Sequence, residues 1–440
     1  MNESIRDETA KTTAGNYFVS NYPPFSFWQG ETREAVVEHL AEPPREPADL
    51  GVYVHIPFCR KRCDFCYFKV YTDKNSAAVR RYIDAVLREA ERATEFAALR
   101  DRKPDLVYFG GGTPSYLSIE QLEELFTGLR SIFSWELARE VTFECEPGTL
   151  QESKIHGLHE LGVTRLSLGV ENFDPEILEL NNRAHRAKEI HTAYEHARAA
   201  GFPQINIDLI AGMVGETDEG WQRCIDATTA MAPESVTIYQ MEVPFNTTMF
   251  RRMRDGNSEV APVADWATKR RWVGEAFAAL EACGYHVGSA YTACKNDEVQ
   301  FLYRDNLWHG ADMLGLGVSS FSHVQGMHFQ NEHDFDPYCE AALAGELPVH
   351  RSLLLDTKAR FRREFILQLK LGRVARSYFR DKFGVDPVEH FSPYLIELAK
   401  DGFVEVDDLH VVLSRAGLLR VDSLLHGFFE ARYGVRSEPV

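Results

Sequence analysis

Short apolar runs alternate with longer amphipathic stretches through residues 51–240, and this rhythm decides the class of fold. Each apolar run has the length of a strand, and apolar residues at helical spacing fill the stretches between runs. Strands that alternate with helices build a parallel sheet with the helices outside it. Six units are too few to complete an eight-stranded barrel, so we expect an open α/β sheet. The six runs are Val52–Ile56, Leu106–Phe109, Val141–Glu144, Arg165–Val170, Ile205–Ile210 and Ser235–Tyr239.

Helix-start signals support this alternation. Ser118 with Gln121, and Thr149 with Glu152, have the spacing of capping boxes. Asp174–Pro175 predicts an N-cap followed by proline at the first helical position. The strand-like runs end in polar or glycine-containing loops, and parallel α/β folds place their functional residues at those carboxyl ends.

Three cysteines follow the first strand-like run, in the stretch Tyr53-Val-His-Ile-Pro-Phe-Cys-Arg-Lys-Arg-Cys-Asp-Phe-Cys. Cys59, Cys63 and Cys66 have the spacing C-x₃-C-x₂-C. Three thiolates close together hold a soft metal or an iron–sulfur cluster, and three ligands on a four-iron cluster leave one iron open for chemistry. A structural zinc site needs four ligands, and no fourth cysteine lies nearby in the sequence. The alternatives are three core cysteines that cluster by chance and a zinc site completed by a distant histidine.

The cysteine spacing, with the aromatic Phe65 just before the third cysteine, resembles the signature of the radical S-adenosylmethionine (SAM) superfamily. The wider string from Tyr53 to Cys59 resembles one branch closely, the oxygen-independent coproporphyrinogen III oxidase-like family. The resemblance covers residues 50–325 well and the remainder more loosely. It implies a partial (β/α)6 radical SAM barrel with a lateral mouth, a [4Fe–4S] cluster on the three cysteines, and one or two molecules of SAM.

The resemblance also assigns candidate contacts to SAM. Gly110-Gly-Gly-Thr-Pro-Ser follows the second strand-like run and lacks the Gly-Lys-Ser/Thr of a phosphate loop, and its glycines let the backbone approach a ligand. Arg183 resembles the family's contact to the SAM carboxylate, which an arginine fork matches geometrically. Exposed acids, a surface cation and core packing are the alternative readings for such residues. The candidate contacts are Tyr53, Phe65, Gly111, Gly112, Thr113, Glu144, Glu171, Arg183, Asp208, Met241 and Phe321.

Two positions depart from the oxidase pattern. Glu171, in Gly-Val-Glu, stands where the oxidase has glutamine, so it adds a carboxylate that reverses a hydrogen bond or binds a different group. Phe68 stands where the oxidase has a further cysteine. Tyr53 and Glu171 are the candidate catalytic residues. These departures leave the substrate open, although the superfamily and the branch are well specified.

The resemblance implies a reaction in which a reduced cluster cleaves SAM and a 5′-deoxyadenosyl radical takes hydrogen from a substrate carbon. In the oxidase this leads to decarboxylation of tetrapyrrole propionates. In the related class C methyltransferases a second SAM supplies carbon to a flat aromatic substrate. We expect an oxidoreductase of porphyrin biosynthesis, with a methyltransferase or cyclopropanase acting on an aromatic natural product, a haem chaperone and a zinc-stabilised scaffold as alternatives. An electron donor such as flavodoxin or ferredoxin is implied.

Charge and composition restrict the partners. The 440 residues carry a net charge of −18, which disfavours nucleic acid and anionic membrane surfaces as the main partner. No apolar run reaches 18 residues, so no membrane span is expected. Eight cysteines in a chain of this length indicate buried thiols in a reducing compartment rather than a disulfide scaffold. We expect a cytoplasmic monomer that binds a small-molecule substrate.

The chain outside the alternating region predicts two further parts. Residues 1–45 contain Asn16-Tyr-Phe-Val-Ser-Asn-Tyr-Pro-Pro-Phe-Ser-Phe-Trp, an aromatic arm that we expect to pack on the body, with cover of a site as the alternative. Residues 46–345 form the barrel and its extension, where Arg304, Trp308 and His309 either line a pocket or pack. Residues 346–440 predict a small winged-helix-like α+β domain, with a hairpin near residues 402–414, that covers the substrate or packs on the barrel.

Overall fold

A curved mixed sheet carries the fold of this computed structural model, which describes residues 11–28, 32–44 and 48–433. Within those ranges the sheet has 12 strands in the order β12-β11-β10-β9-β1-β2-β3-β4-β5-β6-β8-β7. The predicted alternation is confirmed, because the six runs form parallel neighbours in chain order. These strands are β1 (Leu50–Ile56), β2 (Leu106–Gly111), β3 (Glu140–Cys145), β4 (Arg165–Glu171), β5 (Gln204–Ala211) and β6 (Ser235–Gln240).

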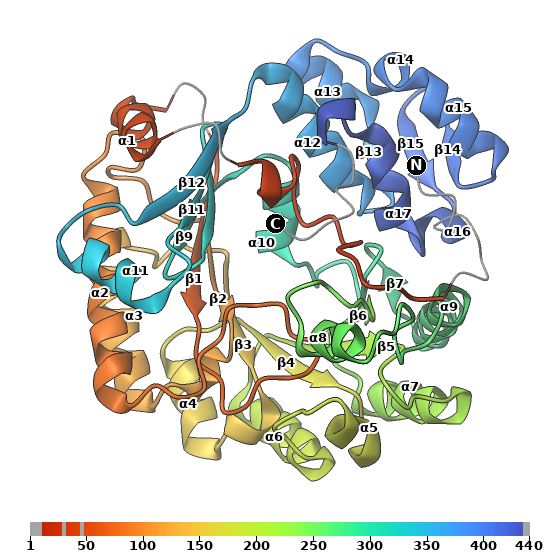
Figure 1. The fold of residues 1–440 in the computed structure, drawn as a ribbon, viewed down its shortest axis with the longest axis horizontal. Helices are drawn as coiled ribbons and strands as arrows, with labels where there is room; N and C mark the ends of the chain where they lie inside the picture. The colour runs from red at the N-terminus through yellow and green to blue at the C-terminus, as the bar shows by residue number, and fades with distance from the viewer. Residues whose placement is uncertain (1–10, 29–31, 45–47, 434–440) are drawn as a thin grey trace.

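Helices lie around the outside of the curve (Figure 1). They are α2 (Ser76–Thr94), α3 (Ile119–Phe133), α4 (Glu152–Glu160), α5 (Pro175–Leu180), α6 (Ala187–Ala200), α7 (Asp218–Met231) and α9 (Trp266–Ala282). Helix α8 (Thr248–Asp255) lies instead beside the loop that follows β1, where the Met249 amide donates to the Asp64 carbonyl at 2.9 Å. The predicted capping box at Ser118 is confirmed at the start of α3, and Asp174 caps α5. The box at Thr149 is wrong, because the Thr149 hydroxyl donates to the Glu146 carbonyl and α4 begins with Gln151 as its N-cap.

Alternate residues of β1–β6 have opposite environments, as the two-residue period of a strand requires. Val52, Phe109, Phe143, Leu166 and their equivalents are buried against the outer helices in the main hydrophobic core. The intervening residues face the inside of the curve and are largely polar. This inward set supplies Tyr108, Glu144, Arg165, Ser167, Asn206, Asp208, Thr237 and Tyr239.

The sheet is longer than predicted at both edges. Strand β9 (Asp312–Leu316) pairs in parallel with β1, although some 250 residues of chain separate them. Antiparallel strands β10 (Phe321–Val324), β11 (Met327–Asn331) and β12 (Val349–Leu354) continue from β9. Strands β8 (Thr292–Cys294) and β7 (His286–Val287) extend the opposite edge beyond β6. The helices of these regions are α1 (Arg33–Ala41), α10 (Leu302–Trp308) and α11 (Phe335–Leu343).

The C-terminal part combines helices with a small antiparallel sheet, as predicted. The sheet has the order β13-β15-β14, in strands β13 (Arg373–Ala375), β14 (Val404–Val406) and β15 (His410–Leu413), and β14–β15 is the expected hairpin. The helices are α12 (Thr357–Leu369), α13 (Arg376–Phe383), α14 (Pro387–His390), α15 (Ser392–Lys400), α16 (Arg415–Leu418) and α17 (Val421–Leu425). Short 3-10 turns occur at Phe25–Phe27, Pro114–Tyr116, Pro147–Thr149, His426–Phe428 and Ala431–Tyr433.

The N-terminal arm runs between the C-terminal part and the barrel (Figure 1). Tyr22 and Trp28 are fully buried, and Val19 belongs to the same hydrophobic cluster as the C-terminal core. Residues 1–10, 29–31 and 45 of the predicted arm segment lie outside the described residues. The arm therefore packs on the body, as expected from its aromatic content.

Candidate functional site

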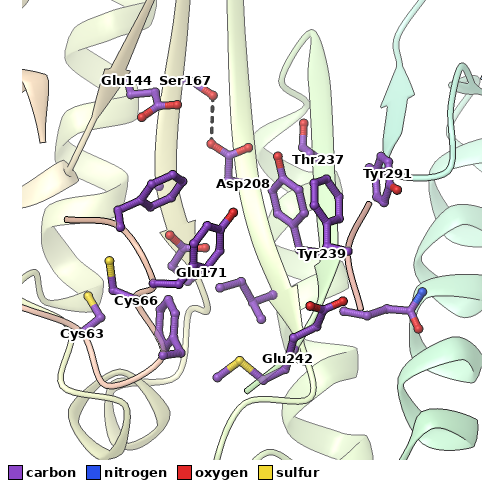
Figure 2. A pocket seen from close by; sticks show the side chains of 18 of the residues that line it. Cys63, Cys66, Glu144, Ser167, Glu171, Asp208, Thr237, Tyr239, Glu242 and Tyr291 are labelled. Atoms are coloured by element: carbon purple, nitrogen blue, oxygen red, sulfur yellow. Dashed lines mark hydrogen bonds between the residues drawn. The ribbon is translucent and has the colours of Figure 1, made fainter. Parts of the chain in front are cut away.

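A cavity of about 410 Å³ occupies the inside of the curved sheet. Its wall comes from the inward residues of β2–β6, the cysteine loop after β1, the arm at Tyr17 and Phe18, and residues 418–423 of the C-terminal part. Figure 2 shows Cys63 and Cys66 on one side, Tyr239 and Tyr291 on the other, and the carboxylates of Glu171 and Asp208 between them. Segments from distant parts of the sequence thus meet at one chamber.

The three predicted cysteine ligands share this wall. Cys59 and Cys63 are each 9% exposed, and Cys66 is partly buried. The Thr113 hydroxyl donates to the Cys59 sulfur at 3.3 Å, and Arg183 Nη1 donates to the Cys63 sulfur at 3.3 Å. Hydrogen bonds to ligand sulfurs stabilise and tune iron–sulfur clusters.

The spacing of the sulfurs fits a cluster better than one small ion. Sulfurs bound to a single tetrahedral zinc lie about 3.8 Å apart, since the Zn–S bond is about 2.3 Å. Among the described residues, the three cysteines do not bring their sulfurs all within 4.8 Å of one another. Burial raises the pKa of the Cys59 thiol to about 12 and that of Cys66 to about 11, so their thiolates need the positive charge that bound iron supplies. The donor set therefore fits a [4Fe–4S] cluster.

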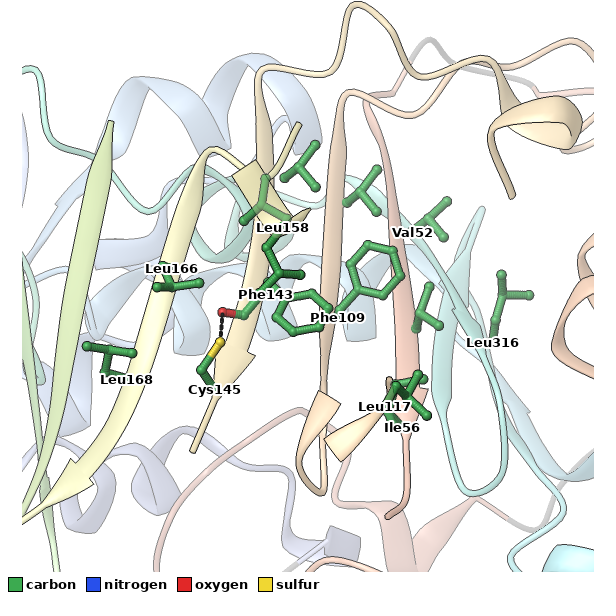
Figure 3. Packing of buried hydrophobic residues seen from close by; sticks show 14 of the residues in the cluster. Val52, Ile56, Phe109, Leu117, Phe143, Cys145, Leu158, Leu166, Leu168 and Leu316 are labelled. Carbon is green, nitrogen blue, oxygen red and sulfur yellow. Dashed lines mark hydrogen bonds between the residues drawn. The ribbon is translucent and has the colours of Figure 1, made fainter. Parts of the chain in front are cut away.

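Cys145 also borders the cavity, but its sulfur belongs to the hydrophobic core. It lies next to the Phe143 carbonyl at 3.9 Å, among apolar side chains that pack outside the sheet (Figure 3). Its neighbour Glu144 faces inward, as the alternation along β3 requires. Cys145 is therefore no fourth ligand beside the cysteine loop.

Glu144 and the glycine loop form one polar corner of the cavity. Tyr108 donates its hydroxyl to Glu144 Oε1 at 2.6 Å, and the Gly111 amide donates to Oε2 at 3.1 Å. Burial is the main cause that raises the pKa of Glu144 to about 7. A Cβ on Gly111 would lie 2.4 Å from the His55 ring, and one on Gly112 would lie 2.8 Å from the Ile56 carbonyl oxygen. Only glycine fits here, so backbone atoms form this part of the wall.

Arg183 and Glu171 form a buried charged pair beside Cys63. The Arg183 Nη2 atom donates to the Gly169 carbonyl at 2.6 Å and lies 3.5 Å from Glu171 Oε1. Glu171 has φ +64°, in the left-handed region, at a register shift in the β4–β5 pairing. Burial raises the pKa of Glu171 to about 7, although Arg183 opposes that shift. The Arg183 Nε atom is buried without a hydrogen-bond partner among the described residues, so it is available to a ligand carboxylate.

Asp208 lies deeper in the barrel on β5. Ser167 donates its hydroxyl to Asp208 Oδ2 at 2.8 Å (Figure 2). Asn206 donates its amide to Oδ1 at 2.9 Å. Burial raises the pKa of Asp208 above its usual value. These hydrogen bonds fix the carboxylate where it borders the cavity between the cysteines and the aromatic wall.

Met241 and Phe65 also line the cavity. Met241 is 2% exposed and belongs to a small hydrophobic cluster, and Phe65 packs against that cluster. Tyr53 and Phe321 lie outside the lining of the cavity. Phe321 stacks on Phe25 of the arm, with ring centroids 3.9 Å apart.

Tyr53 faces the interior of the barrel beneath the cavity wall. Its hydroxyl lies 3.0 Å from His55 Nδ1, and its ring stacks on Tyr108 with centroids 5.9 Å apart. Because Tyr108 contacts Glu144, Tyr53 supports the polar corner from behind.

The aromatic wall opposite the cysteines was not predicted as part of a site. It contains Tyr239 and Tyr291, whose rings stack with centroids 6.0 Å apart, and Phe18 of the arm, 5.4 Å from Tyr291. Glu242 lies at its base and accepts the Tyr17 amide at 3.2 Å, and burial raises the pKa of Glu242 to about 8. The sequence signals were the end of the sixth strand, which places Tyr239 inward, and the aromatic content of the arm.

Three residues considered for the pocket pack elsewhere. Trp308 is buried at 7% exposure, and His309 Nδ1 lies 2.7 Å from the Asp305 carbonyl. Arg304 donates to the hydroxyls of Ser289 and Thr292. These three residues therefore pack within the fold and do not line the cavity.

Comparison with known proteins decides the family. The family model described as Radical SAM superfamily matches residues 53–227. The Heme chaperone HemW of Mycobacterium tuberculosis is 31% identical over 345 residues, which cover 77% of this chain and 86% of that protein. The chain belongs to the radical SAM superfamily, in its oxygen-independent coproporphyrinogen III oxidase-like family.

Two further relatives place this radical SAM protein within the family. The oxygen-independent coproporphyrinogen III oxidase of Pseudomonas aeruginosa is 29% identical over 392 residues, covering 85% of this chain and 84% of that protein. The solved structure of coproporphyrinogen III oxidase (HemN) from Escherichia coli superposes with a TM-score of 0.80 at 26% identity, covering 93% of this chain and 96% of that chain. Across the described residues, no helix has the length and apolar character to span a membrane.

Proposed function

We propose that this protein is a radical SAM enzyme that holds a [4Fe–4S] cluster on Cys59, Cys63 and Cys66 and acts on a large flat substrate of the tetrapyrrole class. The supporting observation is a single cavity that runs from the three thiols to a wall of stacked aromatic rings. The coproporphyrinogen oxidases among its relatives support the same substrate class. The reaction that we favour is oxidase-like.

The residues beside the thiols suit the polar parts of SAM. The backbone of Gly111 and Gly112 admits the methionine end, and Thr113 supports Cys59. Arg183 offers a cation and a free Nε donor to a carboxylate, while Glu144 accepts hydrogen bonds from an amino group or hydroxyl. When bound, the cluster and SAM together would supply a radical that removes a hydrogen atom from a substrate carbon.

The far end of the cavity suits the substrate. Tyr239, Tyr291 and Phe18 present ring faces on which a planar molecule stacks. Residues of the arm and of the C-terminal part line this end of the cavity. Holding a substrate carbon in one place beside the cluster is the protein's share of the reaction.

Anaerobic incubation with SAM, a reductant and coproporphyrinogen III tests the proposal by mass spectrometry. We expect 5′-deoxyadenosine together with a porphyrinogen that has lost carboxyl mass. The Cys59→Ala, Cys63→Ala and Cys66→Ala variants should lose iron and both products. Cys283→Ala is the matched control, because Cys283 is an exposed free cysteine. Iron and deoxyadenosine retained in all three cysteine variants would refute the cluster assignment.

A methyltransferase is the second candidate, because Glu171 departs from the pattern of the oxidase. Its buried carboxylate beside Arg183 adds a charge where the sequence resemblance expects a glutamine. The same incubation separates the candidates, because a gain of methyl or methylene mass indicates transfer. Tight haem binding without substrate-dependent deoxyadenosine would instead indicate a chaperone, as in the HemW relatives.

A further inference from the structure

A second cluster of metal-binding side chains lies away from the cavity. Glu332 follows β11, His333 comes next in the chain, and His350 is the second residue of β12. One ligand atom of each residue lies within 4.8 Å of the others, and no other trio among the described residues meets this spacing. We propose that Glu332, His333 and His350 form a binding site for a zinc-like divalent transition metal.

The backbone holds the three residues together. The Glu332 amide donates to the Pro348 carbonyl at 2.6 Å, and the Glu332 carbonyl accepts the Ser319 amide at 2.8 Å. The β11–β12 pairing continues on the other side, with Asn331 opposite Val349. The residues therefore stay adjacent while their side chains, 31–51% exposed, bring one ligand atom each within 4.8 Å of the others.

The separations match a shared ion. His350 Nδ1 lies 3.6 Å from Glu332 Oε2, and the His333 and His350 ring centroids are 4.7 Å apart. Nitrogen and oxygen ligands of a tetrahedral zinc lie about 3.4 Å apart, because each bond is about 2.1 Å. Two imidazoles with one carboxylate are a donor set that zinc, cobalt and nickel accept.

The surroundings supply the outer contacts that metal-binding histidines use. His333 Nε2 lies 3.2 Å from Asp334 Oδ2, and a carboxylate in such a position helps to hold the imidazole ring of a metal-binding histidine. Lys69 donates to Asp334 Oδ1 at 2.7 Å, and Lys69 belongs to the segment that follows Cys66. An ion would therefore join β12 to the β11–α11 connection and, through Asp334, brace the loop that leaves the cysteines.

The alternative is a pair of separate surface ion pairs. Exposed pairs of this kind contribute little, roughly 0–1 kcal/mol each. Two protonated rings at this separation would also repel each other, whereas a metal binds both in the neutral form. The two readings differ in one measurable property, which is stoichiometric metal uptake.

Equilibrium dialysis of cluster-reconstituted protein against zinc, after removal of chelator, tests the site. We expect one zinc per chain beyond any held at the thiols, and a dissociation constant at least about 10-fold weaker in His333→Ala and His350→Ala. His286→Ala is the matched control, because the His286 side chain is 43% exposed and lies 3.8 Å from a carboxylate, that of Asp297, outside the proposed site. Unchanged iron content shows that each variant is folded.

The proposal is overturned if the parent protein and both histidine variants bind the same amount of zinc. This holds whether that amount is no zinc or one zinc ion per chain. Cobalt(II) in place of zinc distinguishes this site from the cysteines. Binding at Glu332, His333 and His350 gives a visible spectrum without sulfur-to-cobalt charge transfer, and His350→Ala removes it. A spectrum with that charge transfer, unchanged in His350→Ala, assigns the uptake to the thiols and also overturns the site.

Discussion

Arg183 connects the cysteine loop to the end of β4. Its guanidinium contacts the Cys63 sulfur, the Gly169 carbonyl and the Glu171 carboxylate. A planar fork reaches these groups at once, while a lysine ammonium, as a compact point charge, cannot. The sequence identified Arg183 through its resemblance, but its contact with Cys63 depends on a fold that brings residues 63 and 183 together.

Arg183→Lys should weaken SAM binding by about 10- to 100-fold, because one or two charge-assisted hydrogen bonds are lost. Iron content should stay near that of the parent protein, since the three thiols are untouched. Equilibrium binding of SAM to the reconstituted protein measures the effect. Arg223→Lys is the control, because Arg223 is 64% exposed and pairs with Asp174 on the outer surface. Equal affinity in the two variants would remove Arg183 from the SAM site.

Glu89 makes stability depend on pH. Its carboxylate is 2% exposed on α2 and accepts hydrogen bonds from Gly317, Asn331 and Tyr338. Burial raises the pKa of Glu89 from 4.5 to about 7. The folded state therefore binds a proton at Glu89 more tightly than the unfolded state does. The resulting stabilisation of the folded state is fully present below about pH 4.5 and is lost as the pH rises through 7.

Glu89→Gln should remove that dependence. Relative to the variant, the parent protein should lose up to about 3 kcal/mol of unfolding free energy between about pH 5 and pH 8. Anaerobic urea titrations at several pH values measure the difference, with the exposed Glu123→Gln on α3 as the baseline. A difference that is flat or rises with pH would show that Glu89 is charged throughout this range.

At the scale of elements, the strands that are marked by an apolar run in the sequence could be predicted, and the strands without such a run could not. The six runs lie within one or two residues of β1–β6, because each run is apolar on the side that packs under helices. Strand β9, Asp-Met-Leu-Gly-Leu, gives no such local pattern, and its place beside β1 depends on pairing across most of the chain. Gly315 of β9 also lies close to β10, where a Cβ would be 2.3 Å from the Phe321 carbonyl oxygen.

The same limit applies to the site. Residues that follow strand ends in a recognisable motif, such as Cys59 or Gly111, could be named from sequence. Tyr239 and Glu242 were missed because their role depends on what faces them across the cavity. Phe321 was proposed by resemblance, yet in this chain its ring stacks on Phe25 of the arm, a contact between distant segments that no local pattern signals.

The last residue of β2, Gly111, offers a prediction at the scale of an element. Gly111→Ala places a methyl group against the His55 ring in a backbone with φ +109°. Gly201→Ala is the matched control, since Gly201 has φ +82° with nothing within 4 Å of the added carbon. Both variants carry the cost of a left-handed residue, and only Gly111→Ala adds a clash. We expect it to lose about 1–3 kcal/mol more in urea unfolding, and equal losses would contradict the close approach.

At the scale of the molecule, a second core joins parts that the sequence divides. Its members include Val19 of the arm, Tyr291 and Trp308 of the barrel extension, and Phe365 and Leu425 of the C-terminal part. The division at residues 45 and 345 stays a proposal about folding units. What the shared core implies is that the cover of the cavity forms only when all three parts are in place.

Asp422 holds this cover together. Its carboxylate accepts the Val19 amide at 2.9 Å and the Tyr291 hydroxyl at 2.6 Å, and it lies 3.0 Å from the ammonium of Lys370, which is 1% exposed. Lys370 in turn donates to the Val19 carbonyl. One acid therefore links the C-terminal part to the arm and to the aromatic wall.

Asp422→Asn should leave Lys370 as a buried cation without its counter-charge, at a cost of about 3 kcal/mol in unfolding free energy. The arm should then detach more often, so limited proteolysis should cleave residues 11–28 faster. When the arm and the C-terminal part no longer hold together over the cavity, SAM should also be cleaved without substrate. Deoxyadenosine formed in the absence of substrate measures this reaction. Asp226→Asn, at an exposed position of α7, is the control. If arm cleavage and stability match that control, Asp422 does not close the chamber, and the aromatic wall must be held by packing alone.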